Sequence, residues 1–324
     1  MESALIEVNE LKKYFKIGRG KVVKAVDGIT FSLNRGETLG VVGESGCGKT
    51  TLGRAIMHIY EPTSGTVDLC GERIDPRERG YRRKLSGKMQ MIFQDPYSAL
   101  DPRMTVGDIV VEGLNARSIG SRASRRAKAM ELLKLVGLNE EHANRFPHEF
   151  SGGQRQRIGI ARALSMDPKL IICDEPISAL DVSIQAQVMN LLIELQSSMN
   201  LTYIFVAHDL AMVRYISKSI MVMYLGAEVE YGSSSAVYHA PLHPYTKSLF
   251  SAILVPSVRD RSDSRRIKLE GEIPSPINMP PGCRFHPRCQ YSTEVCRRES
   301  PVRDEVLPGH FCACHHAREV NGLA

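Results

Sequence analysis

The chain has 324 residues, enough for one large domain with an extension, and its 43% hydrophobic and 24% charged residues permit a packed core and disfavour a disordered chain. It has no run of about 18 uncharged apolar residues, and its acidic N-terminus lacks signal-peptide features, so we expect neither a transmembrane helix nor secretion. We interpret the net charge of +6 as an aid to solubility, with attraction to anionic lipid or nucleic acid as the alternative.

The first third of the chain has the pattern of a sheet followed by the start of an α/β unit. Residues 5–35 alternate short apolar runs with polar breaks, as strands do. Residues 37–42 then form a β-rich run that stops at a glycine-rich loop, and residues 50–59 indicate a helix. Strand, loop and helix in this order predict the beginning of a parallel α/β sheet, with a further strand at residues 66–69.

The middle of the chain changes to helical periodicity with many charges over residues 104–165. Beyond it, two continuous apolar runs are typical of strands covered on both faces. After about residue 235 the composition shifts to proline, histidine, arginine and cysteine, so we place a domain boundary there. The predicted elements are helices at 127–136, 152–165 and 184–199 and strands at 170–173 and 203–206.

The glycine-rich loop fits the phosphate-loop pattern G-x-x-x-x-G-K-[ST]. Its glycines allow backbone N–H groups to surround phosphate oxygens at a helix N-terminus. Lys49 is predicted to reach the β- and γ-phosphates, and Thr50 to place its hydroxyl on Mg²⁺. The predicted nucleotide-binding residues are Gly43, Glu44, Ser45, Gly46, Cys47, Gly48, Lys49, Thr50 and Thr51.

A pair of carboxylates, Asp174 and Glu175, follows the buried run 170–173. Open α/β sheets place ligand chemistry at the carboxyl ends of their strands. An isolated acidic pair after a strand is usually a turn or a helix start, but a phosphate loop in the same chain favours a magnesium role. We therefore predict that Asp174 holds Mg²⁺, directly or through water, and that Glu175 polarises the attacking water.

A third motif precedes the helix at 152–165. It reads Phe150-Ser151-Gly152-Gly153-Gln154. Here the chain resembles the nucleotide-binding domain of ABC transporters, whose signature is L-S-G-G-Q, with Phe150 in place of leucine. The resemblance implies that Ser151, Gly152, Gly153 and Gln154 face the phosphate loop of a partner subunit, so that ATP lies between two chains.

Other elements of that family follow in order from residue 5 to about residue 235. Gln94 resembles the glutamine loop, which senses Mg²⁺ and the membrane partner. Asp181 ends a segment that resembles the loop through which the two subunits touch, and His208 resembles the switch histidine that contacts γ-phosphate. Phe15 matches the aromatic side chain that stacks on adenine, with the adjacent Tyr14 as the alternative.

The resemblance implies an α/β fold of the P-loop NTPase (RecA-like) class with an antiparallel β subdomain and an α-helical subdomain. It places an ABC nucleotide-binding domain at residues 1–235, its helical subdomain at about 95–165, and a C-terminal extension at 236–324. In this family two ATP molecules hold two such domains together, and Glu175 with His208 would then permit attack of water on γ-phosphate.

The extension resembles that of oligopeptide, dipeptide and nickel importers, from His243-Pro244-Tyr245-Thr246 and from the glutamine-loop context at residues 94–103. Five of the eight cysteines lie within 283–314, and reduced thiols clustered in this way indicate a metal or cluster site. Zinc, with nearby histidines as ligands, and plain buried cysteines remain open, and Cys312 is an additional thiol that could substitute as a ligand. The residues that match the cysteines holding a [4Fe-4S] cluster in some relatives are Cys283, Cys289, Cys296 and Cys314.

The sequence therefore predicts an ATPase subunit that powers oligopeptide or dipeptide import, bound peripherally at the cytoplasmic face of the membrane. The implied partners are two permease subunits, a second similar ATP-binding subunit and an extracytoplasmic substrate-binding protein, with no nucleic acid. A homodimer is chemically feasible, and nickel or sugar cargo remains open. A soluble ABC ATPase acting on ribosomes or DNA is disfavoured by the single phosphate loop and the lack of heptads, and an exporter by the importer-type extension.

Overall fold

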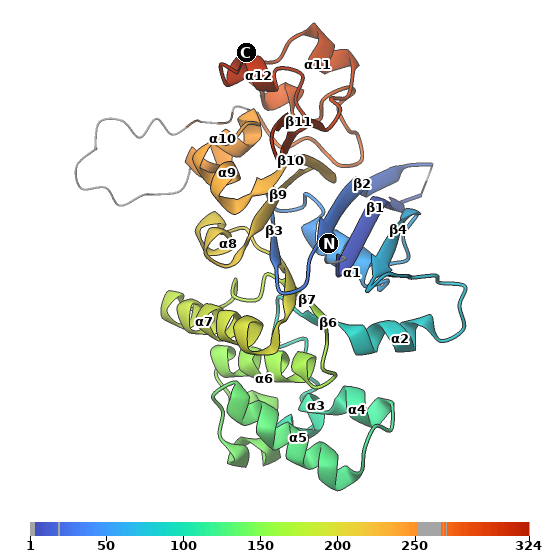
Figure 1. Ribbon diagram of the computed structural model, residues 1–324, viewed down its shortest axis with the longest axis vertical. Helices are drawn as coiled ribbons and strands as arrows, with labels where there is room; N and C mark the ends of the chain where they lie inside the picture. The colour runs from blue at the N-terminus through green and yellow to red at the C-terminus, as the bar shows by residue number, and fades with distance from the viewer. Residues whose placement is uncertain (1–3, 19, 252–266, 268, 270, 324) are drawn as a thin grey trace, which may run out of the picture. The chain divides into compact units, whose positions relative to one another are not determined.

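The computed structural model describes residues 4–18, 20–251, 267, 269 and 271–323 (Figure 1). By compactness the chain divides into two units, each assembled from separate stretches. The first unit comprises Met1–Leu5, Leu33–Thr38 and Ile74–Val206, and the second comprises Ile6–Ser32, Leu39–Arg73 and Ala207–Ala324. The domain boundary near residue 235, between the ABC nucleotide-binding domain and the C-terminal extension, stays a prediction.

The first unit contains three parallel strands whose side chains are almost entirely buried. Ile172 in the middle strand lies opposite Met91 on one side and Ile204 on the other. Burial on both faces explains the unbroken apolar runs in the sequence, which contain no polar face for solvent. The strands are β6 (Met89–Ile92), β7 (Leu170–Asp174) and β8 (Thr202–Val206), and α7 (Val182–Met199) connects β7 to β8.

The helices of the first unit follow the predicted helical stretch. Helices α3, α5 and α6 pack on one another through buried side chains that include Leu132, Leu133 and Ile158. Helix α5 begins at Arg122, ahead of the predicted start at residue 127, because the Ser121 hydroxyl accepts a hydrogen bond from the Ser124 N–H and caps the helix there. The helical segments are α2 (Tyr81–Lys88), α3 (Val106–Val110), α4 (Glu112–Ala116), α5 (Arg122–Leu135), η1 (Glu140–Asn144), η2 (Pro147–Glu149) and α6 (Gly152–Leu164).

The second unit contains a four-stranded sheet in the order β2-β1-β4-β5, in which β1 pairs antiparallel with β4. Its strands β2, β1 and β4 are labelled in Figure 1. Ile6, Val8 and Leu11 of β1 are fully buried, and the residues between them are polar and exposed. The alternation from Ile6 to Val8 is what the pattern of residues 5–35 predicts, and an irregularity in the pairing of β1 with β4 between Asn9 and Lys12 shifts the buried position by one residue to Leu11. The strands are β1 (Ile6–Lys16), β2 (Val22–Leu33), β4 (Ser64–Leu69) and β5 (Glu72–Arg73).

A second group of paired strands connects β3, the strand before the glycine-rich loop, to the C-terminal extension. β3 (Thr38–Val42) runs parallel to β9 (Ser219–Tyr224), and β10 (Ala227–Ser233) pairs antiparallel with β9. β12 of the extension pairs antiparallel with β10 and β11. The remaining elements of this unit are α1 (Lys49–Ile56), α8 (Leu210–Ile216), α9 (Ser234–His239), α10 (Pro244–Ser251), η3 (His286–Arg288), α11 (Glu294–Arg298), β11 (Asp304–Leu307), β12 (His310–Cys312) and α12 (Ala317–Val320).

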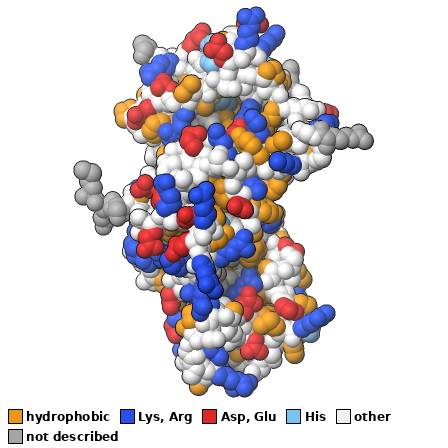
Figure 2. Space-filling view, turned by 90° about the vertical axis from the view of Figure 1, so that its right-hand side faces the viewer, with side chains coloured by type: hydrophobic (Ala, Val, Ile, Leu, Met, Phe, Trp, Pro, Cys, Tyr) orange, Lys and Arg blue, Asp and Glu red, His pale blue; other side chains and the backbone are white. Residues whose placement is uncertain are grey.

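The lengths of the helices and the charges on the surface relate to two predictions from the sequence, the lack of a transmembrane helix and the role of the net charge. Among the described residues, every helix is too short or too polar to cross a membrane. On the face shown in Figure 2, basic and acidic side chains are interspersed. This mixture suits the interpretation of the net charge as an aid to solubility.

Candidate nucleotide site

The phosphate loop is a tight turn between β3 and α1 that only glycine can form at two of its positions. Gly43 and Gly48 have φ angles of 151° and 108°. A Cβ atom at Gly48 would come within 2.0 Å of the Ala25 carbonyl oxygen, and one at Gly43 within 2.2 Å of the Met223 carbonyl oxygen. The motif glycines therefore allow the loop to lie directly against β2 and β9.

Lys49 places its ammonium group inside this turn. Its Nζ donates hydrogen bonds to the carbonyl oxygens of Gly43, at 2.8 Å, and Glu44, at 3.1 Å, and the residue is only 5% exposed. Burial raises the pKa of the neighbouring Cys47 thiol, which keeps that group neutral. Thr50 and Thr51 follow in the first turn of α1. The loop thus presents one cation and a helix N-terminus, the combination that attracts phosphate.

The two aromatic candidates for adenine stacking have different surroundings. The Tyr14 hydroxyl donates to the Asp27 carboxylate, and burial together with this bond raises the pKa of Tyr14 to about 12. Phe15 is half-buried, with its ring edge-on to Tyr60 at a centroid distance of 5.4 Å. Both rings therefore have partners in the protein, and the choice of Phe15 for stacking stays a prediction.

His208 lies exposed in the stretch that leads to α8. The next residue, Asp209, caps that helix by accepting hydrogen bonds from the N–H groups of Ala211, at 2.8 Å, and Met212, at 3.2 Å. The cap fixes the backbone next to the histidine. The described part of the second unit thus holds Phe15, the phosphate loop and His208.

The first unit brings together two of the predicted catalytic residues. Asp174 ends β7 and is 1% exposed, and the N–H of Glu175 donates to the Val206 carbonyl oxygen at 2.9 Å. The Gln94 side-chain amide donates to the Glu175 carboxylate at 2.7 Å. The predicted acidic pair therefore stands at a strand end, and the glutamine orients the second carboxylate.

The signature segment forms the N-terminus of α6. The Ser151 hydroxyl accepts a hydrogen bond from the Gln154 N–H at 3.4 Å, and the Gln154 side chain accepts one from the Ser151 N–H at 3.0 Å. This reciprocal capping box confirms the predicted start of the helix. Phe150, which replaces leucine, is buried with its ring edge-on to His142, so the larger side chain fills the core.

Two further features complete the sites of the first unit. A Cβ atom at Gly153 would come within 2.4 Å of the Ile184 side chain, so α6 approaches α7 closely at this glycine. Asp181, the predicted subunit-contact residue, is the exposed N-cap residue of α7. The first unit therefore holds Gln94, the Ser151 segment, the acidic pair and Asp181.

The cysteine tract contains two buried cysteines, Cys296 and Cys312, and three that are half-buried. The Cys283 N–H donates to the Cys296 carbonyl oxygen at 2.8 Å. Burial, followed by the charges of neighbouring thiols, raises the pKa of Cys283 and of Cys314 to about 11. All eight cysteines are free. Within the described ranges, no three His, Cys, Asp or Glu side chains converge to hold a metal ion, so the geometry does not support the predicted metal site at Cys283, Cys289, Cys296 and Cys314.

The additional thiol and the nearby histidines are engaged in the protein. Cys312 is 1% exposed in a hydrophobic cluster with Leu242, Val306 and Ala317, so it is a core side chain. One ring nitrogen of each histidine lies within 3 Å of a protein partner: His286 of the Cys283 carbonyl, His310 of Glu230, His315 of the Glu299 carbonyl and His316 of the Thr293 hydroxyl. These contacts give the zinc alternative no support either.

Sequence reasoning missed a set of residues around Glu44. The Glu44 N–H donates to the Tyr245 hydroxyl at 2.8 Å, and the Glu44 carboxylate pairs with Arg288. Neither contact follows from a local spacing, because the partners lie 201 and 244 residues further along the chain. The only available signal was that both belong to the tail whose motifs resemble importer extensions.

Comparisons with known proteins show the family to which the chain belongs. Residues 26–178 match the ABC transporter family, and residues 229–296 match the family described as oligopeptide/dipeptide transporter, C-terminal region. The chain is 51% identical to the putative oligopeptide transport ATP-binding protein YkfD of Bacillus subtilis, covering 96% of this chain and 95% of the relative. It is 45% identical to the di/tripeptide transport ATP-binding protein DppF of Pseudomonas aeruginosa, covering 99% of this chain and 100% of the relative.

Solved structures show the same fold. The ATP-binding cassette MJ0796, in a dimeric post-hydrolysis state bound to ADP and Pi, matches with a TM-score of 0.64 and 29% identity, covering 71% of this chain and 98% of that one. The protein cbiO1 of Clostridium perfringens, part of the ABC transporter complex cbiONQ, matches with a TM-score of 0.65 and 29% identity, covering 74% of this chain and 92% of that one. The phosphate loop, the capped signature helix and these likenesses define an ATP-binding protein of the ABC transporter class with the P-loop NTPase fold. Within that class, the chain belongs to the family of oligopeptide/dipeptide transport ATP-binding subunits.

Proposed function

We propose that this chain hydrolyses ATP to power the import of oligopeptides or dipeptides through a membrane ABC transporter. The observation that carries the proposal is the turn at Gly43–Thr50, which encloses the Lys49 ammonium in a chain similar over its whole length to peptide-transport ATP-binding proteins. A loop of this shape binds the phosphates of a nucleotide, and the importer-type extension points to peptide cargo.

Nucleotide binding uses residues of several types. Lys49 binds the β- and γ-phosphates, together with the N–H groups of the loop, and Phe15 stacks on adenine. Thr50, Gln94 and Asp174 offer hydroxyl, amide and carboxylate oxygens, the hard donors that suit Mg²⁺. Mg²⁺ held by these residues would neutralise part of the negative charge of the phosphates.

The hydrolytic step relies on Glu175 and His208. The Glu175 carboxylate accepts a hydrogen bond from Gln94, which fixes its direction, and it orients the water that attacks γ-phosphate. His208 donates toward the γ-phosphate. Their joint role is positioning and charge stabilisation, the terms that dominate phosphoryl transfer.

We also propose the assembly. Ser151, Gly152, Gly153 and Gln154 of one subunit cover the nucleotide held by the other, and Asp181 lies at the contact between subunits. The dimeric form of the structurally similar cassette supports this arrangement. A second similar ATP-binding subunit, two permease subunits and an extracytoplasmic binding protein complete the transporter, and this chain lies peripherally at the cytoplasmic face of the membrane.

A transport assay tests the proposal. Cells lacking this chain receive the parental gene, the Lys49→Ala variant or the Arg298→Ala variant, and uptake of labelled di- and oligopeptides is measured. Arg298 is an exposed control, since its ion pair with Glu294 lies on the surface of α11. We expect uptake with the parental chain and with Arg298→Ala but none with Lys49→Ala. Peptide uptake that does not depend on the chain, or dependence of nickel or sugar uptake instead, would reject peptide import.

The [4Fe-4S] cluster at Cys283, Cys289, Cys296 and Cys314 is the finer part of the proposal. Its support is the family resemblance alone, since no three suitable side chains converge on a metal site among the described residues. Bound iron would stabilise the thiolate forms, which burial disfavours. Anaerobically purified protein should be brown and contain iron and acid-labile sulfide. Colourless protein without iron, or with stoichiometric zinc, would refute the cluster.

A further inference from the structure

We infer that Arg288 is a positioning residue for the phosphate loop, so that the C-terminal extension sets the affinity for ATP. The inference rests on the proposed function and adds to it a contact between two parts of the second unit. Arg288 and Arg284 both lie in the short segment 282–289, which we call the arginine segment. Each reaches an element that shapes the phosphate loop.

Arg288 forms a two-pronged ion pair with Glu44, the second residue of the loop. Its Nη1 and Nη2 atoms lie 2.7 and 3.0 Å from the two carboxylate oxygens. The Arg288 side chain is only 7% exposed, and its bond to Glu44 raises the pKa of the guanidinium further. A bidentate ion pair fixes the orientation of the carboxylate as well as neutralising its charge, and a lysine ammonium cannot do both. Glu44 is therefore held in one orientation.

The backbone of Glu44 is held by the extension as well. Its N–H donates to the hydroxyl of Tyr245, a fully buried residue of α10. The Tyr245 ring packs with Tyr224, at a centroid distance of 4.7 Å, and with Phe285 of the arginine segment, at 5.4 Å. The loop thus rests on an aromatic cluster that the extension completes.

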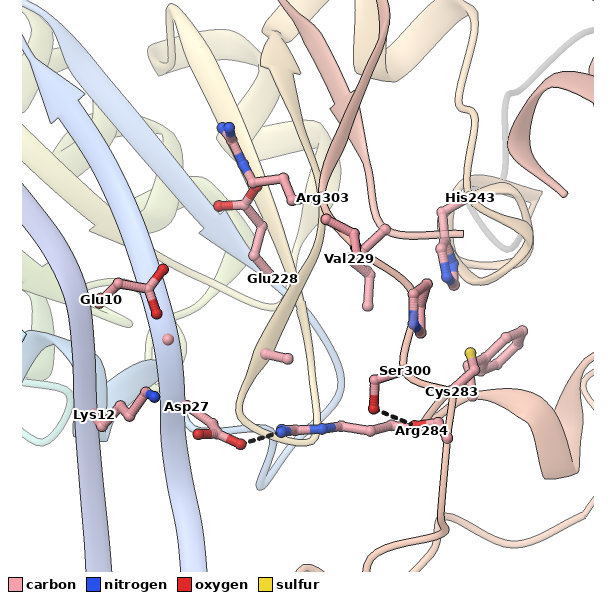
Figure 3. Close-up of a pocket in the computed structure, with 17 residues that line it drawn as sticks. Glu10, Lys12, Asp27, Glu228, Val229, His243, Cys283, Arg284, Ser300 and Arg303 are labelled. Carbon is pink, nitrogen blue, oxygen red and sulfur yellow. Dashed lines mark hydrogen bonds and ion pairs between the residues drawn. The ribbon is translucent and has the colours of Figure 1, made fainter. Parts of the chain in front are cut away.

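Arg284 acts at the other end of the loop. It crosses from the arginine segment to pair with Asp27 of β2, as Figure 3 shows. It also donates to the Leu225 carbonyl oxygen. The next residue, Gly226, donates its N–H to the Cys47 carbonyl oxygen at 2.8 Å. The two arginines therefore fix the start of the loop through Glu44 and its end through the turn at Leu225–Gly226.

Electrostatics gives Arg288 a second effect on nucleotide binding. Glu44 would place a negative charge beside a loop that binds a triphosphate, and this charge would repel the nucleotide. Arg288 neutralises it at short range in a nearly buried position. Loss of Arg288 should thus weaken ATP binding through both a looser loop and an unpaired carboxylate.

The test measures ATP binding to the purified subunit and the ATPase kinetics of the assembled transporter. We expect Arg288→Ala to raise the Kd and KM for ATP about tenfold while kcat changes less than about twofold. Arg288→Lys should restore part of the affinity, because it keeps the charge and loses the second prong. The double variant Glu44→Gln/Arg288→Ala should bind ATP no more weakly than Arg288→Ala, because it removes the unpaired carboxylate.

Matched controls separate this inference from a folding defect and from the proposed function. Arg298→Ala removes another arginine of the extension, in an exposed pair, and should leave ATP affinity unchanged. Thermal melting should show each variant folded. If Arg288→Ala binds ATP like the parental protein while Lys49→Ala loses binding, the inference fails and the nucleotide site stands. If Lys49→Ala also binds ATP normally, the nucleotide site itself is wrong.

Discussion

The Gln94–Glu175 hydrogen bond gives the proposed catalytic carboxylate a defined direction. Glu175 has a φ angle of 46°, in the left-handed region that few non-glycine residues adopt. Its N–H is bonded to Val206, so neighbouring strands hold this backbone in place. Strained backbone held by its surroundings is common where a side chain must be aimed. The role of Glu175 can be tested with a side chain of the same shape.

Glu175→Gln should retain ATP binding but lower the rate of hydrolysis by at least about 100-fold, since an amide cannot accept the proton of the attacking water. ATP should then hold the subunits in a closed dimer. ATPase assays and size-exclusion chromatography with and without ATP measure both effects. Hydrolysis at the parental rate would remove Glu175 from the mechanism.

Two glycines of the phosphate loop offer a matched comparison of clash and backbone strain. Gly48 and Gly46 both have positive φ, but an added Cβ meets the Ala25 carbonyl oxygen only at Gly48 and meets nothing within 4 Å at Gly46. Gly48→Ala should destabilise the protein by about 3 kcal/mol and abolish ATP binding, whereas Gly46→Ala should cost about 1 kcal/mol. Denaturant unfolding and nucleotide titration measure both. Equal effects of the two substitutions would show that the close approach to β2 is unimportant.

At the scale of elements, Glu230 joins three parts of the second unit. It is completely buried on β10, and its carboxylate accepts hydrogen bonds from the N–H groups of Leu242 and His243, each at 2.8 Å. His310 of β12 lies 2.7 Å from the same carboxylate. A buried charge requires such partners, so these bonds fix β10, the start of α10 and β12 together. His243 is itself buried beside Glu230, and this burial changes its pKa.

Burial lowers the pKa of His243 from 6.5 to about 4, against an opposing effect of Glu230. The folded state thus favours neutral His243. The lowered pKa makes a contribution to the free energy of unfolding, on the order of 3 kcal/mol, that is present above pH 6.5 and is lost as the pH falls toward 4. His243→Asn should therefore show a shallower loss of stability between these pH values, measured by denaturant unfolding. His148→Asn, at an exposed position, should keep the parental slope. The same slope for both variants would contradict this assignment.

The elements that motifs and periodicity specify could be predicted from the sequence. The strands β7 and β8 appear as unbroken apolar runs, and the start of α6 is encoded in Ser151 and Gln154. The start of α5 was misplaced because the charged residues after Ser121 lack an apolar stripe, and the cap alone decides that boundary. The partners of Glu44 could not be predicted, because a fold rather than a spacing brings Arg288 to it.

At the scale of the whole molecule, the capped N-terminus of α6 is the surface that should meet a second subunit. Gly152→Asp adds a carboxylate at the start of this helix, where the helix dipole tolerates it but a phosphate would be repelled. In the Glu175→Gln background it should abolish the ATP-induced dimer without loss of stability. Gly152→Ala adds only an ordinary 3.5 Å contact with Leu180 and should still dimerise. A dimer that survives Gly152→Asp, seen by light scattering, would exclude this surface.

The pairing of β12 with β10 has a practical consequence for attempts to produce a minimal ATPase. Cutting the chain after β10 would make β10 an edge strand with unpaired N–H and C=O groups. Exposed edge strands of this kind pair with other chains and promote aggregation. The shortened product would also lack both arginines that reach the loop region. A fragment that is insoluble or binds nucleotide poorly would therefore report on the missing tail rather than on a defective motif.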